Sequence, residues 1–411
     1  MTSVCVVGSG GREHALADVL SRTADVVVTP GSAGIPGSTP RPPDEIEADL
    51  FVVGPEAPLV DGLADRLRAR GALVFGPGAD GARLEGSKTW MKDVLVAAGV
   101  PTARHGAFDD EAAALAFLDE LADLFVVKTD GLAAGKGVLV TESRAEAADA
   151  VREYLSGRAF GEAGRSLVIE EGLSGPELSV FAVCDGQRAV PLLPAQDFKR
   201  VGDDDTGPNT GGMGAYSPVP LADAGLVDDV MAKFVEPTLA ELRARGIDYR
   251  GVLFAGLMLT PDGPKMLEYN VRFGDPEAQV VLPLLDTELS DLLGQAAAGA
   301  ITTEPRFSAD HMVTVVAATE GYPEAPRTGD VIEGLAEADA LEGVKVYCAG
   351  VASSPEGLRT AGGRVLAVSG RGPSLGVARD RAYAGVAAVS WPGMHHRDDI
   401  ARVAMEGEAT T

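Results

Sequence analysis

Cysteine, histidine and tryptophan are scarce in this chain. Among 411 residues there are three cysteines, five histidines and two tryptophans. No two of Cys5, Cys184 and Cys348 form a C-x-x-C pair, and we expect small buried thiols in a reducing compartment. No pair of histidines has the i, i+4 spacing of a helical zinc site, so we expect no zinc centre.

Long apolar runs and a leader pattern are also missing. No uncharged apolar stretch reaches the roughly 18 residues that a membrane span needs. The N-terminus, Met1-Thr2-Ser3-Val4, runs straight into a strand pattern rather than into a charged region followed by an apolar one. We therefore expect no membrane partner and no secretion, and we predict a cytoplasmic location.

Basic residues are few relative to acidic ones. The chain has 35 lysines and arginines against 61 aspartates and glutamates, which gives a net charge of −26. A body this negative repels nucleic acid at long range, so we predict no nucleic-acid partner. It also repels phosphorylated small molecules, so any such substrate must be held by cations and backbone N–H groups within local motifs.

Two lysines, Lys128 and Lys136, flank a loop with the sequence Thr-Asp-Gly-Leu-Ala-Ala-Gly. Apolar runs at 124–127 and 138–140 lead into and out of it, which predicts strand, flexible loop and strand. A lysine ammonium suits a phosphate oxygen, and glycines let the backbone approach a polyphosphate. The pattern predicts binding of a nucleoside triphosphate.

A carboxylate, an amide and a guanidinium follow one another at alternate positions in Glu268, Asn270 and Arg272. Side chains alternate along a strand, so we expect all three on one face. Glu268 and Asn270 offer the oxygen ligands that Mg²⁺ prefers, and Arg272 can neutralise charge on a transferred phosphoryl group. We predict a metal–phosphate site here, with a solvated edge strand as the alternative.

Apolar strands alternate with helical stretches over the first hundred residues, which predicts a parallel sheet with βαβ crossovers. We expect strands near 4–7, 26–28, 50–53 and 73–75, helices over 13–20 and 61–70, and Gly/Pro-rich loops at 8–11, 54–58 and 76–78. Later on we expect one helix over 277–299 and a strand hairpin over 251–270. Residues 201–220 are predicted to form an ordered functional loop.

Together these motifs resemble the ATP-grasp ligases, and more specifically the glycinamide ribonucleotide synthetase family. The segments that carry the resemblance are 8–15, 53–59, 84–88, 128–137, 205–218 and 270–277. The resemblance implies an α/β and α+β multidomain fold. Its parts would be an N-terminal parallel-sheet domain for substrate phosphate (1–102), a two-subdomain ATP-grasp core (103–322, lid about 123–188) and a small C-terminal α+β domain (323–411).

The resemblance also implies site residues. For ATP they are Lys88, Lys128, Gly135, Lys136, Gly137, Glu170, Glu171, Leu173 and Glu177. For the other substrates they are Gly10, Gly11, Arg12, Glu13, Asp205, Asn209, Thr210, Gly211 and Arg272. Arg272, Lys136 and Asp205 would be catalytic, and Glu268 and Asn270 would hold Mg²⁺ or Mn²⁺. Because strand neighbours face opposite sides, one of Glu170 and Glu171 must point away from the nucleotide.

The implied reaction joins glycine to 5-phosphoribosylamine through glycyl phosphate, with ATP as co-substrate, in a monomer or weak homo-oligomer. Two alternatives stay open: another ATP-grasp ligase of purine synthesis, against which the 205–218 segment argues, and a nucleotide-binding regulatory protein without turnover. A dehydrogenase is disfavoured. Its nucleotide fold usually places an acidic residue after the second strand, where this chain has Thr29-Pro30-Gly31.

Overall fold

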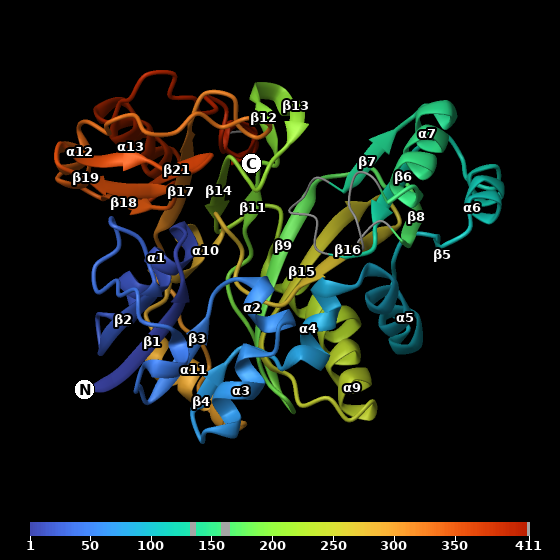
Figure 1. The fold of residues 1–411 in the computed structure, drawn as a ribbon, viewed down its shortest axis with the longest axis horizontal. Coiled ribbons are helices and arrows are strands. Elements are labelled where there is room, and N and C mark those ends of the chain that lie inside the picture. The colour runs from blue at the N-terminus through green and yellow to red at the C-terminus, as the bar shows by residue number, and fades with distance from the viewer. Residues whose placement is uncertain (132–136, 158–164, 409–411) are drawn as a thin grey trace.

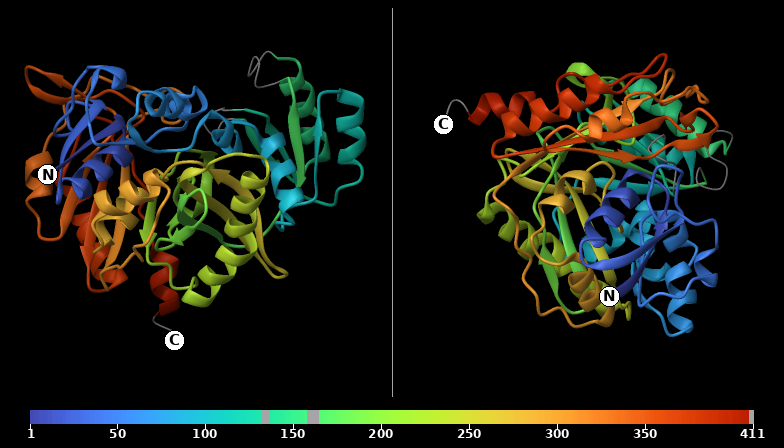
Figure 2. Two further views of the ribbon diagram at one scale, coloured as in Figure 1. Left: turned by 90° about the horizontal axis from the view of Figure 1, so that it is seen from below. Right: turned by 90° about the vertical axis from the view of Figure 1, so that its left-hand side faces the viewer.

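The structure is a computed structural model that describes residues 1–131, 137–157 and 165–408. The first 75 residues and the C-terminal section lie side by side at one end of the molecule, blue and orange-red in Figure 1. A small unit made from residues 105–131, 137–157 and 165–171 stands apart at the other end, as the left view of Figure 2 also shows. Long strands connect the two ends.

The N-terminal sheet is parallel, as the sequence predicts. Its order is β2–β1–β3–β4, from β1 (Thr2–Gly8), β2 (Ala24–Pro30), β3 (Leu50–Val53) and β4 (Leu73–Phe75). Its connections contain α1 (Gly11–Leu20), η1 (Pro43–Glu45), α2 (Glu56–Val60) and α3 (Leu63–Ala69). The prediction of a loop over 54–58 is wrong from Glu56 onward, because α2 begins there. Pro58 lies in the first turn of α2, where its missing N–H costs no helical hydrogen bond.

The unit that stands apart overlaps the lid predicted over about 123–188, and we call it the lid; the predicted bounds stay a prediction. Two helices, α4 (Ala79–Gly86) and α5 (Lys88–Ala98), precede it. Its sheet has the order β5–β8–β6–β7, from β5 (His105–Phe108), β6 (Phe125–Thr129), β7 (Val138–Thr141) and β8 (Leu167–Glu171), covered by α6 (Glu111–Leu118) and α7 (Arg144–Leu155). The side chains of these elements pack around a separate core, so the lid does not share the main one.

The third sheet runs through the middle of the molecule with the order β10–β9–β15–β16. Its strands are β9 (Glu177–Asp185), β10 (Ala189–Pro191), β15 (Arg250–Thr260) and β16 (Gly263–Asn270), with the helices α8 (Ala224–Val230), η4 (Met231–Val235) and α9 (Glu236–Ala244) nearby. The hairpin over 251–270 is confirmed. Between Gly256 and Leu257 the register skips Leu267, which marks a β-bulge in β16.

The fourth sheet joins strands from distant parts of the chain in the order β11–β14–β17–β21–β18. They are β11 (Gln196–Asp197), β14 (Gly214–Ser217), β17 (His311–Ala318), β18 (Val344–Cys348) and β21 (Arg364–Gly372). Helices α12 (Leu335–Asp339), α13 (Leu375–Ala388) and α14 (Arg402–Glu408) and the hairpin of β19 (Val351–Ser354) and β20 (Gly357–Thr360) complete this region. The sheet crosses the boundary placed at residue 322, so that division stays a prediction.

Two further sequence expectations differ from the structure. The loop expected over 201–220 contains a short hairpin, β12 (Arg200–Gly202) and β13 (Thr206–Asn209) around η3 (Asp203–Asp205), and it ends in β14. The single helix expected over 277–299 is broken into α10 (Ala278–Val281), η5 (Leu282–Leu284) and α11 (Leu289–Ala298). Pro283 has no N–H and its ring clashes with a preceding carbonyl, which disfavours a regular α-helix at this point.

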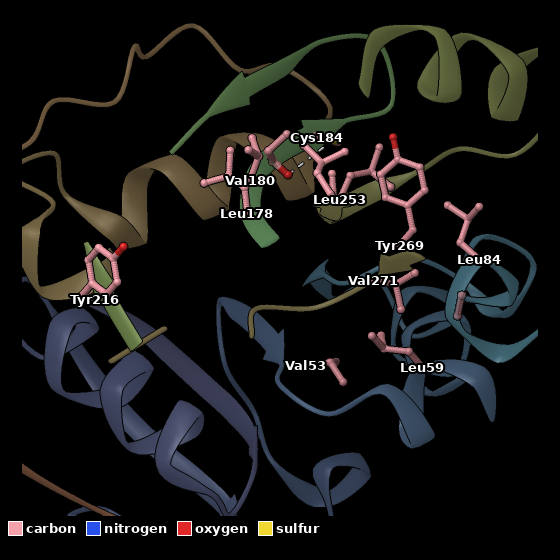
Figure 3. Close-up of a cluster of buried hydrophobic side chains, with 14 of the residues drawn as sticks. Val53, Leu59, Leu84, Leu178, Val180, Cys184, Tyr216, Leu253, Tyr269 and Val271 are labelled. Carbon is pink, nitrogen blue, oxygen red and sulfur yellow. Dashed lines mark hydrogen bonds between the residues drawn. The ribbon is translucent and has the colours of Figure 1, made fainter. Parts of the chain in front are cut away.

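One hydrophobic core joins the N-terminal, central and C-terminal parts. Val53 and Leu59 from the N-terminal domain belong to the same cluster as Leu178 and Leu253 of the central sheet, as Figure 3 shows. Tyr269 is buried in it, and its hydroxyl donates to the carbonyl of Phe234 at 3.0 Å. Burial of apolar area on this scale holds these parts together as one body.

A buried histidine sits where the N-terminal domain meets the C-terminal sheet. Nδ1 of His14 in α1 accepts a hydrogen bond from the backbone N–H of Cys348 in β18 at 2.8 Å. Its ring also meets Tyr347 edge-on, with centroids 5.4 Å apart. Burial, helped by the nearby Lys345, lowers the pKa of His14 to about 4. The folded state therefore holds the ring neutral.

We expect this histidine to make the docking of the two domains sensitive to acid. Below pH 6.5 His14 becomes protonated in the unfolded chain, whereas in the folded chain it stays neutral until about pH 4. The free energy of unfolding is therefore not reduced by His14 above pH 6.5. As the pH falls from 6.5 towards 4, it decreases by up to roughly 3 kcal/mol. In His14→Gln, whose amide oxygen can still accept from Cys348, this loss should vanish. Thermal midpoints of both proteins from pH 7 to 4.5 test this, and a constant difference would contradict it.

Candidate active site

Lys128 lies at the end of β6 and carries its charge into a buried ion pair. Its Nζ is 2.8 Å from Oε1 of Glu170 in β8, and the two side chains are 9% and 3% exposed. Burial alone would lower the pKa of Lys128, but the carboxylates of Glu170 and Glu268 raise it above its usual value. The lysine is therefore held charged near the end of β6, an inner strand of the lid sheet.

Lys92 is the second cation on the same carboxylate, and sequence reasoning missed it. Its Nζ lies 2.9 Å from Oε2 of Glu170 and donates to the hydroxyl of Thr102 at 2.8 Å. Burial, despite Glu170, lowers the pKa of Lys92 to about 8. A signal was available: Lys92 is one helical turn beyond Lys88, so both lie on one face of α5.

The three alternating polar residues lie on one side of β16 and its extension. Tyr269 and Val271 between them are buried in the core, and Nη2 of Arg272 donates to Oδ1 of Asn270 at 3.1 Å. The bulge at Leu267 has a consequence for this strand. It lets Met266 join the core with Tyr269 although simple alternation would place Met266 on the polar face.

Arg272 is anchored by two carboxylates from the N-terminal part of the chain. Its Nη2 donates to Oε1 of Glu85 at 2.9 Å, and its Nε reaches Glu56 at 3.4 Å. Glu85 also accepts from the backbone N–H of Val271 at 2.8 Å. The guanidinium is thus oriented by its partners. Both glutamates lie in segments that carry the family resemblance, 53–59 and 84–88, but the sequence does not show their pairing with Arg272.

Lys199 adds another cation beside Glu268. Its Nζ donates to Oε2 of Glu177 at 2.5 Å, and its carbonyl accepts from the backbone N–H of Thr210 at 2.7 Å. Burial alone would lower the pKa of Lys199, but Asp197, Glu177 and Glu268 hold it well above its usual value. Two predicted site residues, Glu177 and Thr210, therefore meet at this lysine.

Lys88 completes the group of cations around Glu268. It begins α5, and its Nζ donates to the carbonyl of Gly131 at 3.1 Å. Burial would raise the pKa of Glu268, yet Lys199, Lys128 and Lys88 together keep it below its ordinary value. We call this arrangement the cation cluster; its members are Lys88, Lys92, Lys128, Lys199 and Arg272.

The donor set at Glu268 and Asn270 fits a hard divalent cation. It offers an ionised carboxylate and an amide oxygen, which are the ligand types that Mg²⁺ prefers. Among the described residues no three His, Cys, Asp or Glu side chains converge as a complete metal site. The remaining ligands would then have to come from substrate oxygens and water, which is how proteins usually hold Mg²⁺.

The two neighbouring glutamates of β8 point in opposite directions, as the sequence requires. Glu170 faces Lys92 and Lys128, whereas Oε1 of Glu171 accepts from the backbone N–H of Arg104 at 3.0 Å and lies 3.4 Å from Nζ of Lys265. Leu173 follows the strand and is half-buried. The adenine contacts proposed for these residues stay a prediction.

The glycine loop after β1 uses some of its own donors. The N–H of Gly10 donates to Oε2 of Glu13 at 2.6 Å, and Nη1 of Arg12 donates to the carbonyl of Phe273 at 3.1 Å. A Cβ on Gly11 would lie 2.7 Å from Nε2 of Gln279, so a larger residue there would displace the amide of Gln279. The binding of a phosphate by this loop stays a prediction.

The segment from 205 to 212 is attached to the C-terminal domain. Asp205 is 71% exposed on its side chain and pairs with Arg397 at 2.8 Å, and Asn209 is half-buried in β13. Gly211 donates its N–H to the hydroxyl of Tyr322 at 3.0 Å. Asp205 therefore has its charge partner outside the cation cluster, and its catalytic role stays a prediction.

Arg364 of β21 fixes the glycines of this segment and was missed by sequence reasoning. Its Nη1 donates to the carbonyls of Gly211 and Asp275, both at 2.6 Å, and its Nη2 lies 3.2 Å from Oδ2 of Asp275. Asp275 in turn accepts from Gln279 behind the glycine loop. The C-terminal domain thus shapes the backbone on which several predicted substrate residues lie.

Two predicted residues of the lid loop, Gly135 and Lys136, lie outside the described residues. Gly137 is described, and its carbonyl accepts from the N–H of Thr129 at 2.8 Å, which closes the hairpin of β6 and β7.

None of the helices in the described part of the chain combines the length and apolar character needed to cross a membrane.

Comparison with known proteins gives a consistent result over the whole chain. Family descriptions of phosphoribosylglycinamide synthetase match in three consecutive parts: the N domain over 2–85, the ATP-grasp (A) domain over 86–278 and the C domain over 312–403. A phosphoribosylamine–glycine ligase of Streptomyces coelicolor is 48% identical over 418 residues, covering 97% of this chain and 98% of the relative.

Solved structures agree. The crystal structure of a phosphoribosylamine–glycine ligase from Thermotoga maritima superposes with a TM-score of 0.83 at 34% identity, covering 97% of this chain and 100% of that one. The N5-carboxyaminoimidazole ribonucleotide synthetase of the same organism has a TM-score of 0.62 at 15% identity, covering 95% and 99%. At that identity the second likeness concerns the fold alone.

We expect Arg272 to be structurally coupled to Glu85. In Arg272→Met the carboxyl of Glu85, 10% exposed, loses its guanidinium partner, which should cost about 3–5 kcal/mol of unfolding free energy. Glu85→Gln introduced on top should recover part of that loss. Arg327→Met, at an exposed ion pair, is the control and should change stability by less than about 1 kcal/mol. Denaturant titrations measure this; equal losses in the single and double variants would contradict it.

Proposed function

The chain belongs to the phosphoribosylglycinamide synthetase family, and on that premise we infer that it joins glycine to 5-phosphoribosylamine in an ATP-dependent reaction. The products are glycinamide ribonucleotide, ADP and phosphate, a step of purine synthesis. The observation that carries this function is the cation cluster. Lys128 of the lid sheet, Lys88 of α5 and Lys199 between β11 and β12 gather beside the carboxylate of Glu268 in β16.

The reaction proceeds in two steps. The glycine carboxylate attacks the γ-phosphorus of ATP, and the bond to the bridging oxygen breaks, which yields glycyl phosphate and ADP. The amine of 5-phosphoribosylamine then attacks the acyl carbon, phosphate leaves and the nitrogen loses a proton. Neither step needs a covalent bond to the protein, so the chain's own groups act by positioning and charge neutralisation.

We assign the ATP contacts as follows. Lys88 and Lys128 bind triphosphate oxygens, since both ammonium groups sit beside Glu268. Glu171 and Leu173 lie next to the adenine edge, with Glu170 behind them. Glu177 accepts from the ribose hydroxyls through the carboxylate oxygen that Lys199 does not use. Gly135, Lys136 and Gly137 are assigned to the cover over the phosphates from the family resemblance.

We assign Glu268 and Asn270 to a divalent cation, Mg²⁺ or Mn²⁺. When bound, that cation neutralises charge on the phosphate oxygens of ATP. Arg272 neutralises charge on the transferred phosphoryl group, held in place by Glu85 and Glu56. Exclusion of water is a second duty of the lid, because an acyl phosphate hydrolyses readily.

The remaining assignments concern the other substrates and the setting. Gly10, Gly11, Arg12 and Glu13 are assigned to 5-phosphoribosylamine, and the residues Asp205, Asn209, Thr210 and Gly211 to the region where glycine and the amine meet. We place the enzyme in the cytoplasm, as a monomer or weak homo-oligomer, without a nucleic-acid or membrane partner.

Substrate dependence separates this function from its alternatives. ADP release should require glycine and 5-phosphoribosylamine together, measured with a coupled ADP assay. Bicarbonate in place of glycine should not support it. ADP release with bicarbonate and an aminoimidazole ribonucleotide would favour the carboxylating ligase, and ATP binding without any turnover would favour a regulatory protein.

We expect the loss of Glu268 to affect turnover far more than folding. Glu268→Ala should lower kcat by at least about 10², because it removes a charge that acts during phosphoryl transfer. Lys233→Ala, a lysine on the exposed side of η4, serves as the control and should keep normal turnover. Initial rates at saturating substrates measure both. Near-normal turnover in Glu268→Ala would defeat the site assignment.

A further inference from the structure

A buried network around Lys92 connects the lid to the central sheet. Lys92 lies in α5, its ammonium contacts the carboxylate of Glu170 in the lid sheet, and it donates to the hydroxyl of Thr102. Thr102 donates to the carbonyl of Met266 in β16 at 2.7 Å, two residues before Glu268. The network thus runs from the lid to the strand assigned to the metal.

Glu170 has two ammonium groups on one carboxylate. Lys92 is 2.9 Å from one of its oxygens and Lys128 is 2.8 Å from the other. Both lysines and the glutamate are nearly inaccessible, with side chains 2%, 9% and 3% exposed. The three groups together carry one net positive charge. Lys92 and Glu170 cancel each other, which leaves the charge of Lys128 for a ligand.

The arrangement costs free energy, which argues that its charge is used. A buried ion pair is often no more stabilising than apolar residues of the same volume. An ordinary anchor between α5 and the lid could therefore have been apolar. Without Lys92, however, Glu170 would neutralise Lys128 completely, and a triphosphate would meet an ion pair rather than a cation.

We propose that Lys92 is a positioning residue for ATP: by occupying one oxygen of Glu170 it keeps Lys128 oriented and electrostatically available to the triphosphate. Lys92 itself does not touch the nucleotide. The inference rests on the proposed function in one respect, the contact of Lys128 with ATP phosphates. It goes beyond that function because it gives a role in ATP binding to a residue that does not contact ATP: Lys92 keeps the positive charge of Lys128 available.

A charge-swap series tests the proposal. Lys92→Met leaves a neutral Glu170–Lys128 pair, so ATP affinity, measured as the Kd by calorimetry with Mg²⁺ present, should fall about 10-fold to 100-fold. Lys92→Met/Glu170→Gln again leaves one ammonium and no carboxylate, so its Kd should return to within about threefold of the wild type. Lys92→Arg keeps the charge and should stay close to the wild type. Lys233→Met is the matched surface control.

The kinetic readout separates charge from simple loss of structure. In Lys92→Met the KM for ATP should rise, while the KM values for glycine and 5-phosphoribosylamine change less than about threefold. A rise of all three KM values together, or no recovery in the double variant, would overturn the proposal in favour of a merely structural role. Should Lys92→Met not fold, the arginine variant and the double variant still decide.

Lys128→Met distinguishes a failure of this inference from a failure of the proposed function. If Lys128→Met binds ATP normally, the triphosphate assignment itself is wrong and Lys92 has nothing to position. If Lys128→Met loses ATP affinity while Lys92→Met keeps it, the assignment stands and only the role of Lys92 is refuted. Loss of ATP affinity in both, with recovery in the double variant, supports the proposal.

Discussion

Like charges must be brought together in this protein without pushing the fold apart. The cation cluster puts five basic side chains in one region of a chain whose net charge is −26. Each is stabilised by a carboxylate or a carbonyl from another element: Glu170 serves two lysines, Glu177 serves Lys199 and Glu85 serves Arg272. A polyanionic nucleotide is the natural counterpart of such a cluster, and the arrangement of the sheets follows from the need to present it.

The division of the core shows that the lid is attached differently from the other parts. The N-terminal, central and C-terminal parts share apolar contacts, whereas the lid sheet packs around its own set of side chains. The groups that link the lid to the rest near the site are largely polar, as at Lys92, Glu170 and Thr102. Polar links can be remade after a small shift, so the lid is attached by contacts that tolerate motion.

The sequence predicted those features that depend on local pattern. The parallel N-terminal strands, the hairpin over 251–270 and the shared face of Asn270 and Arg272 follow from periods of two and 3.6 residues. It also brought attention to Lys128 and Glu268, because a glycine-bearing loop and an alternating polar strand are visible without a fold. The helix over 277–299 failed where Pro283 interrupts it.

The rest could not be predicted because it depends on contacts between distant segments. Lys92 and Glu170 are 78 residues apart, and Arg272 and Glu85 are 187 apart. Arg364 reaches Gly211 across 153 residues. A single sequence shows that such residues exist but says nothing of which cation will meet which carboxylate. The bulge at Leu267, which decides what faces the core, likewise has no local signature.

The fourth sheet can be completed only late in the synthesis of the chain. β14 follows the substrate segment directly, but its partner β17 ends only at residue 318 and the next strand, β21, at residue 372. On a ribosome that adds roughly 5–20 residues per second, β14 waits several seconds with an unpaired edge. A product that terminates before β17 therefore exposes an unpaired strand edge and lacks the C-terminal residues that pack near the site. We expect chaperones and proteases to recognise such a product.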